Sequence, residues 1–240
     1  MDSETRRPNI PLERMETAEV LACVEPFMSA RPAEIEALAR AAVRVRKPGG
    51  GAILLEGEPA DGLYVLLRGR VNLVRVAGGG RDLILSTLGP GDTFGEVAAF
   101  CGGTMSTTAT TPIHCELLRI PPEALVEHLR REPETALRLM RMQHERLREI
   151  ESVASGLALC DVEERLRRTL ARLAKRQGRR VAADAGWILA PVPTQSELAR
   201  MVGSCRETVS RTLSVLARTG QVTSSGRRMI VNDDLISRYV

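Results

Sequence analysis

The stretch from Thr194 to Leu216, TQSELARMVGSCRETVSRTLSVL, carries the side chains most suited to specific recognition chemistry. Thr194 and Glu197 form the T-x-x-E pattern of a capping box, which predicts that a short helix begins here with Leu198, Ala199 and Val202 inside. Gly203 then supplies a turn, and Ser204 is expected to cap a second helix. The second helix should bury Val209, Leu213 and Leu216 and expose Arg206, Glu207, Ser210 and Arg211.

Two short helices around a glycine turn, the second with an exposed Arg/Glu face, are typical of a helix-turn-helix. Gly220 is expected to end the second helix, and residues 222–231 around Ser225-Gly226 predict a β-hairpin wing. The alternative is an ordinary helical hairpin with a solvated charged face. Residues 161–240 carry 15 Lys and Arg against 8 Asp and Glu, whereas residues 1–160 carry 19 against 22. A basic C-terminal third on a mildly acidic body favours a module that binds a polyanion.

Patterns that would indicate an enzyme are missing from the sequence. There is no Gly-Lys pair for a phosphate-binding loop and no G-x-S-x-G elbow. The stretch His144-Glu145-Arg146-Leu147-Arg148 has Arg where a zinc helix needs its second His. His114 and His128 are not combined with a Cys pair at zinc spacing. We therefore expect no catalytic site and no metal site.

The composition of the 240 residues, 43% hydrophobic and 27% charged, is typical of a globular protein. No apolar run approaches the ~18 residues of a membrane span, and the N-terminal residues lead into no apolar signal core. Membrane association and export are therefore not expected. The cysteines are odd in number and scattered, which favours a reduced cytoplasmic location; they are Cys23, Cys101, Cys115, Cys160 and Cys205.

The elements that must position these residues alternate in type along the chain. Residues 15–45 read as helical, and residues 46–119 contain short apolar runs between glycines and prolines, which predicts a β-sandwich or barrel. A long helix is expected over 133–159, and Asp161 with Glu164 resembles a capping box at a hinge. The fold class is therefore α+β. We expect a β-roll or jelly-roll sensor domain with N-terminal helices at 1–132, a dimerisation helix at 133–160 and a winged helix-turn-helix domain at 161–240.

The long helix contains a heptad seam. Ala136, Gln143, Ile150 and Leu157 recur every seven residues, and a second series fills the intermediate positions. A narrow seam flanked by arginines and glutamates favours pairing with an identical helix. The alternative is a single helix packed on its own barrel. The predicted dimer interface consists of Met140, Gln143, Leu147, Ile150, Ala154 and Leu157.

In this order the motifs resemble the CRP/FNR family of transcription regulators over residues 18–235. The resemblance in the β-roll depends on residues 57–64 (GEPADGLY), 67–71 (LRGRV) and 88–96 (LGPGDTFGE), and in the C-terminal domain on residues 205–211 (CRETVSR). It implies a cyclic-nucleotide-binding-type β-roll, a dimer, and double-stranded DNA and RNA polymerase as partners.

The resemblance also implies roles for individual side chains. Arg206 and Arg211 would donate to guanine edges and Glu207 would accept from cytosine in a palindrome of TGTGA-like half-sites, in agreement with general pairing rules. Ser210 with Glu207 and Arg211 matches an E-x-x-S-R pattern of the FNR branch, which favours TTGAT-like half-sites. The candidate DNA contacts are Thr194, Ser204, Arg206, Glu207, Ser210, Arg211 and Arg227.

Only some of the family's cAMP-binding residues are found at the matching positions of this sequence. Relatives that bind cAMP place an Arg about ten residues after the Gly-Glu pair to neutralise the phosphate, but here Met105 stands at that position and residues 97–118 contain no Arg. Glu151 falls where a base contact is expected and would repel an anionic nucleotide. We therefore predict an effector other than ordinary cAMP. The candidate effector residues are Gly95, Glu96, Val97, Ala98, Met105, Ser106, Ile150 and Glu151.

Other sensing chemistries stay open. An iron–sulfur cluster needs about four thiolates, and the first 45 residues contain only Cys23, so that alternative is not expected. Haem could take His114, Cys115 or His144 as an axial ligand. A thiol switch could use Cys101 or Cys115. A further alternative is a ligand-binding module that controls a protein partner, with a purely structural C-terminal domain.

Overall fold

The computed structural model describes residues 10–78, 82–181 and 186–239. The chain forms two compact units, one of residues 1–76 and 85–149 and the other of residues 77–84 and 150–240. The predicted α+β class is confirmed. Among the described residues, no helix is long and apolar enough to cross a membrane.

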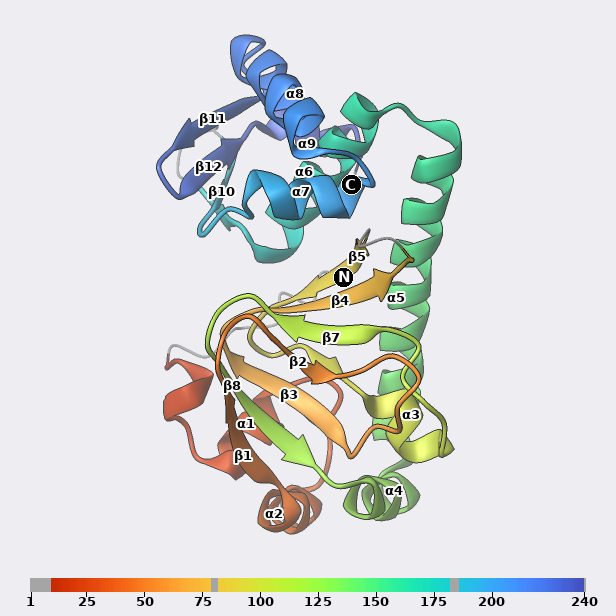
Figure 1. The fold of residues 1–240 in the computed structure, drawn as a ribbon. Coiled ribbons are helices and arrows are strands. Elements are labelled where there is room, and N and C mark those ends of the chain that lie inside the picture. Colours follow the sequence, from red (N-terminus) through yellow and green to blue (C-terminus); the bar gives the residue numbers. More distant parts are fainter. Residues whose placement is uncertain (1–9, 79–81, 182–185, 240) are drawn as a thin grey trace. The chain divides into compact units, whose positions relative to one another are not determined.

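The first unit is built around two four-stranded antiparallel sheets (Figure 1). One has the strand order β1-β8-β3-β6 and the other the order β2-β7-β4-β5. The first consists of β1 (Val43–Lys47), β8 (Cys115–Ile120), β3 (Leu63–Arg68) and β6 (Thr93–Phe94). The second consists of β2 (Gly51–Leu54), β7 (Thr108–Thr111), β4 (Val71–Val76) and β5 (Asp82–Leu88). The apolar runs between glycine and proline breakers therefore form strands, as the sequence predicts.

Strand β3 is buried on both faces. Successive side chains of a strand point to opposite faces, so Tyr64 and Leu66 enter one core and Leu63, Val65 and Leu67 enter another. The first core lies within the roll and includes Phe94, whose ring stacks on that of Tyr64 at a centroid distance of 5.1 Å. The second core lies between this sheet and the helices.

Those helices gather at one end of the two sheets, at the bottom of Figure 1. They are α1 (Thr17–Cys23), α2 (Pro32–Ala41) and α4 (Pro122–Arg131), preceded by the short 3₁₀ helix η1 (Leu12–Arg14). The helical prediction for residues 15–45 is wrong at its end, because Val43–Lys47 form edge strand β1 beside β8. The alternating Val-Arg-Val-Arg pattern of this segment suits a half-buried strand.

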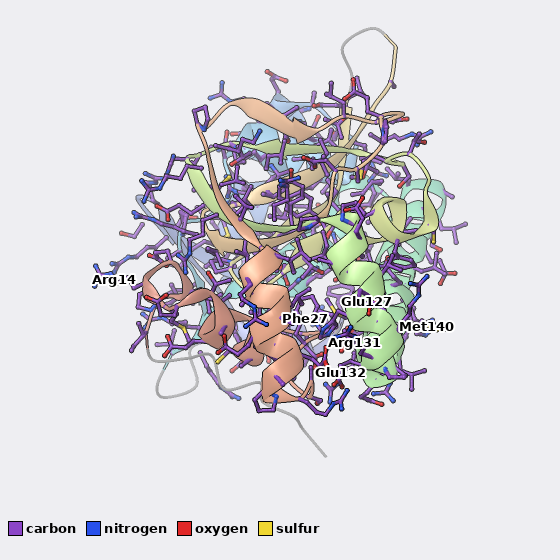
Figure 2. All side chains as sticks on the ribbon, turned by 90° about the horizontal axis from the view of Figure 1, so that it is seen from below. Arg14, Phe27, Glu127, Arg131, Glu132 and Met140 are labelled. Atoms are coloured by element: carbon purple, nitrogen blue, oxygen red, sulfur yellow. The ribbon has the colours of Figure 1, made fainter. Side chains whose placement is uncertain are left out.

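Polar contacts join α2 and α4 where Figure 2 labels Phe27, Arg131 and Glu132. Arg31 Nε lies 2.6 Å from Glu132 Oε1. His128 is buried, with Nε2 3.2 Å from Thr135 Oγ1 and its ring edge-on to Phe27. Thr135 opens the long helix α5 (Pro133–Leu159), so this cluster fixes the junction between α4 and α5.

In the second unit, the end of α5 is followed by α6 (Val162–Gln177), whose N-cap Asp161 accepts a hydrogen bond from Glu164 N at 2.8 Å. A four-stranded antiparallel sheet in the order β11-β12-β10-β9 follows, with two helices between its strands. Its strands are β9 (Arg179–Arg180), β10 (Trp187–Leu189), β11 (Val222–Ser225) and β12 (Arg228–Val231). The helices are α7 (Gln195–Val202), α8 (Arg206–Arg218) and the C-terminal α9 (Asp233–Ser237).

Candidate nucleic-acid interface and ligand site

The capping box at the start of α7 is present as predicted. Glu197 N donates to Thr194 Oγ1 at 3.2 Å, and Thr194 N donates to Glu197 Oε2 at 2.8 Å. These bonds satisfy backbone donors that a helix start otherwise leaves free. Leu198, Ala199 and Val202 are buried, as expected. Helix α7 is therefore a fixed support for the helix that follows.

The turn between α7 and α8 differs from the prediction in one residue. Gly203 has φ +61° and forms the left-handed C-cap of α7, a conformation that glycine adopts without strain. Ser204 does not cap α8: the N-cap is Cys205, which makes no side-chain capping bond. The Cys205 sulfur instead lies 3.1 Å from Thr208 Oγ1. A thiol is a weak acceptor, which is why the sequence favoured the serine.

Helix α8 separates a buried face from an exposed charged face. Val209 and Leu216 are buried, and Leu213 is half-buried. Thr212 is also buried, which the sequence did not predict, and its hydroxyl donates to Thr208 O at 3.0 Å. On the other face Arg206, Glu207 and Arg211 are exposed and Ser210 is half-buried. The structure thus brings four predicted DNA-contacting residues together on one helix.

The charge on Glu207 is stabilised locally. A hydrogen bond from its own backbone amide lowers the pKa of this carboxyl most, followed by a bond from the Cys205 side chain. Arg206 and Arg211 act in the same direction through their charge. An ionised carboxylate only accepts hydrogen bonds, so Glu207 is suited to an amino group on a base edge.

The predicted wing is a hairpin of β11 and β12, in which Ser225 pairs with Arg228. Val222, Met229 and Val231 point into the core. Arg227 in the turn is exposed, and so is Arg228, which sequence reasoning missed. Val192 N donates to Arg227 O at 3.0 Å, which ties the turn to the chain before α7.

Side chains of α6 bond to the end of α7 and to the residue before the wing. Arg165 Nε donates to Val202 O and its Nη1 donates to Cys160 O, both at 2.7 Å. Arg167 Nε donates to Gln221 Oε1 at 3.0 Å, next to the start of the wing. Arg165 and Arg167 thus bond within the protein. Only part of the positive charge of residues 161–240 is therefore available to bind a polyanion.

In the first unit the candidate ligand residues begin at the turn from β6 into α3 (Glu96–Cys101). Gly95 has φ +83°, and a Cβ at this position would lie 2.7 Å from Gly62 O. Only glycine fits such a position. Glu96 follows directly and is 1% exposed, whereas Val97 is 46% exposed. Ala98 belongs to the same helix.

The Glu96 carboxylate is held by α5. Gln143 Nε2 and Arg146 Nη1 both donate to its Oε1, the arginine at 2.8 Å. Arg146 Nη2 also donates to Thr93 O at 2.8 Å. Sequence reasoning missed Arg146, although it lies three residues after Gln143 and so on the same side of the helix.

Met105 occupies the position where the resemblance implies an arginine. It is 7% exposed and packs in the core of the roll. Its backbone pairs with Glu58 O at 2.8 Å and with Gly57 N at 2.9 Å. Ser106 is exposed, and its carbonyl accepts a hydrogen bond from Arg75 Nη1 at 2.7 Å. Ile150 and Glu151 are both exposed and belong to the second unit.

An apolar stripe on α5 is exposed in the single chain. Thr135 and Leu139 are buried against the first unit, whereas most of the seam residues face outward. Figure 2 shows Met140 at the outer edge of the first unit. The exposed fractions are 68% for Met140, 53% for Leu147, 36% for Ile150 and 39% for Leu157, and Ala154 is also exposed. Gln143 lies at the margin of the stripe, because its amide reaches Glu96.

The residues considered for haem or thiol sensing differ in their exposure to solvent. Cys115 is buried, and burial raises the pKa of its thiol. His114 and His144 are exposed, and Cys101 is exposed at the end of α3. The described residues contain no group of three or more His, Cys, Asp or Glu arranged to hold a metal ion.

Comparison with known proteins agrees with both halves of the chain. Residues 44–132 match the family of cyclic nucleotide-binding domains, and residues 164–235 match the Crp-like helix-turn-helix domain. A CRP-like cAMP-activated global transcriptional regulator of Mycobacterium tuberculosis is 33% identical over 221 residues, which cover 90% of this chain and 95% of that protein. The cyclic AMP receptor protein of Thermus thermophilus is 32% identical over 198 residues, 82% of this chain and 87% of that one.

Solved structures agree as well. The c-di-GMP-responsive global regulator CLP of Xanthomonas campestris has a TM-score of 0.69 and 28% identity, and the match covers 84% of this chain and 99% of that one. A CooA mutant from Carboxydothermus hydrogenoformans has a TM-score of 0.72 at 16% identity, which shows the shared fold alone. The relatives are transcription regulators rather than enzymes.

Proposed function

Because the chain belongs to the CRP/FNR family of DNA-binding transcription regulators, we propose that it works as a homodimer that reads a palindromic operator through α8. The observation that carries this proposal is the exposed face of α8, where Arg206, Glu207 and Arg211 stand on a helix fixed by α7 and the wing. The half-sites are TGTGA-like or TTGAT-like, and RNA polymerase is the protein partner that the family resemblance implies.

The arginines of α8 act as base readers, and the wing contacts the DNA backbone. Arginine donates two hydrogen bonds to guanine O6 and N7, whereas an ionised glutamate accepts from the cytosine amine. Arg227 lies at the tip of a hairpin, where a long cation suits a phosphate. Thr194 has its hydroxyl engaged in the capping box, so we expect it to contribute through its position at the start of α7.

The experiment compares Arg206→Ala with Arg227→Ala on a palindromic operator and on scrambled DNA at several salt concentrations. Arg206→Ala should cost about 1–3 kcal/mol on the operator and relax discrimination at one guanine. Arg227→Ala should weaken binding to both DNAs and reduce the salt dependence. An equal loss on both DNAs for Arg206→Ala would remove its role in reading sequence.

The exposed stripe on α5 supports the dimer. Met140, Leu147, Ile150 and Leu157 present apolar surface at coiled-coil spacing, and such a surface on a single chain marks an interface. A two-fold operator requires two recognition helices about one DNA turn apart. Pairing through α5 would supply that second helix.

The effector of the β-roll is not ordinary cAMP. A buried Glu96 could accept from a ribose hydroxyl, but residues 97–118 contain no Lys or Arg for a cyclic phosphate, and Met105, at the expected position, is apolar and buried. Arg75 does reach this stretch, yet it pairs with Glu56 at 3.1 Å and donates to Ser106 O. Losing the cationic partner of a phosphate removes a contact worth about 1.5–3 kcal/mol. The residues present therefore fit the ribose part of the family's ligand and do not fit its phosphate.

A further inference from the structure

The last part of α5, residues 150–159, belongs to the same compact unit as the helix-turn-helix. Helix α5 ends at Leu159 and α6 begins at Val162, so Cys160 and Asp161 alone connect the two helices. Each residue outside a helix brings two backbone dihedrals that can rotate. Side-chain bonds across this connection therefore decide how the helix-turn-helix is oriented on the end of α5.

Arg165 of α6 makes such bonds in two directions. Its Nη1 donates to Cys160 O and its Nε donates to Val202 O, both at 2.7 Å. Cys160 N bonds to Gly156 O at 3.0 Å, so Cys160 continues the last turn of α5. Val202 is the last residue of α7. One guanidinium thus joins the end of α5 to the end of α7, and α8 follows directly after the next turn.

The chemistry of this link suits a fixed geometry. Both acceptors are carbonyls at the C-terminal end of a helix, where the helix itself supplies no donor and where a cation is favoured. Bonds from a charged donor are shorter and stronger than neutral ones, in agreement with both lengths. The side chain of Arg165 is half-buried, and a Cβ on Gly156 would lie 3.7 Å from its Cγ. The arginine stem is therefore also held by packing.

A second contact acts at the turn between α7 and α8. A Cβ on Gly203 would lie 2.8 Å from Leu157 Cδ2, so the Leu157 side chain packs directly against this glycine. Leu157 is also the last residue of the predicted dimer seam, and Ile150 and Ala154 of the seam lie in the same unit. The turn before α8 therefore contacts the part of α5 that carries the end of the seam.

The orientation of the helix-turn-helix on α5 matters for DNA. In a dimer joined through α5, it sets the distance and the angle between the two copies of α8. One base pair added between two half-sites displaces the second half-site by about 3.4 Å and rotates it by about 35°. A dimer with a rigid link cannot follow this change, whereas a dimer that turns freely at the connection between α5 and α6 can.

We propose that Arg165 is a positioning residue that fixes the turn between α7 and α8 on the end of α5, and so sets the half-site spacing that the dimer accepts. This role rests on the proposed function, because it requires a dimer that reads a two-fold operator. The side chains of α8 select the sequence of each half-site, and Arg165 selects the distance between the half-sites.

The link is tested first without DNA, by hydrogen exchange of the full chain. Arg165→Met keeps most of the stem and removes both bonds, so backbone amides in residues 156–160 and 199–204 should exchange at least about threefold faster. Arg168→Met is the matched control, because this arginine of the same helix pairs with Glu164 instead, at 3.0 Å. It should leave both segments unchanged. Unchanged exchange in Arg165→Met, or an equal acceleration in the control, would overturn the link.

The second test measures the discrimination between spacings. An operator is selected from random-sequence duplexes, and one or two base pairs are then added or removed between its half-sites. The wild type should bind the selected spacing at least about tenfold more tightly than the altered ones, and Arg165→Met should bind all of them within about threefold of one another. Arg168→Met should keep the wild-type ratio. Arg165→Lys should give an intermediate ratio, because an ammonium cannot occupy the positions of both guanidinium nitrogens.

The ratio between spacings separates positioning from general support. An arginine that only stabilises the domain would lower the affinity for every spacing by the same factor, and an unchanged ratio in Arg165→Met would refute the role while leaving the proposed function intact. If Arg165→Met does not fold, Arg165→Lys decides, and the full wild-type ratio in that variant would refute the role. A wild type that tolerates every spacing would refute it as well. If the wild type selects no two-fold operator, the proposed function fails, and this role fails with it.

Discussion

Replacing Leu147 with glutamate separates the role of α5 in the dimer from its role in the single chain. The side chain is 53% exposed in one chain, and fully burying a leucine contributes about 1.5–3 kcal/mol. Covering the exposed half would contribute about 1 kcal/mol per chain, or about 2 kcal/mol for a symmetric pair. Placing two carboxylates opposite each other at a two-fold axis costs several kcal/mol more.

The dimer should therefore lose about 4 kcal/mol or more, which raises its dissociation constant about a thousandfold, since 1.4 kcal/mol is a factor of ten. The free energy of unfolding of one chain should change by only about 0.5 kcal/mol, because the position is exposed and glutamate favours helices. Sedimentation velocity at micromolar concentration should show a monomer, with operator binding weakened.

The matched control is Ser152→Glu, which adds the same charge at an exposed position of α5 that lies off the seam. It should stay dimeric and bind the operator as the wild type does. If Leu147→Glu sedimented as a dimer with a dissociation constant within about threefold of the wild type, the seam would not be the interface.

Two further changes test the supports of the site. Burial lowers the pKa of His128 below its ordinary value of 6.5. The unfolded chain therefore binds the proton more tightly than the folded chain does. The stability that the neutral imidazole provides is complete above about pH 6.5 and is lost as the pH falls through the folded-state pKa. Urea titrations at pH 5 and 7.5 should show this slope in the wild type and a smaller one in His128→Gln; equal slopes would contradict it. Thr194→Ala removes the capping box of α7 and should cost about 1 kcal/mol in the same titrations, whereas Ser196→Ala, at an exposed neighbouring position, should cost little.

Local patterns accounted for most of the elements. The apolar runs between breakers became β2 to β5, and the heptad region became α5 with the predicted bounds. The exposed face of α8 also followed from helical periodicity, because the position of a side chain on a helix is fixed by the sequence. Such features depend on neighbours within about one helical turn or one strand.

Features that depend on distant partners were not predictable in this way. Glu96 and Arg146 are 50 residues apart, and nothing in either local sequence indicates that the two meet. The edge strand at Val43–Lys47 was assigned to a helix because its pairing with β8, far along the chain, decides its conformation. The cap of α8 moved from Ser204 to Cys205 because the turn after Gly203 is set by the packing of α7 and α8.

Because β3 is buried on both faces, a truncated sensor fragment needs more of the chain than the matched family region. The family match begins at residue 44, after α1 and α2, yet Leu63, Val65 and Leu67 pack on those helices. A fragment trimmed to the matched region would expose this face of β3 to water, in a short segment of high β-propensity without charge. Segments of that kind associate with one another. A soluble sensor fragment must therefore start before Leu12 and extend past Leu139, since both residues close the same core.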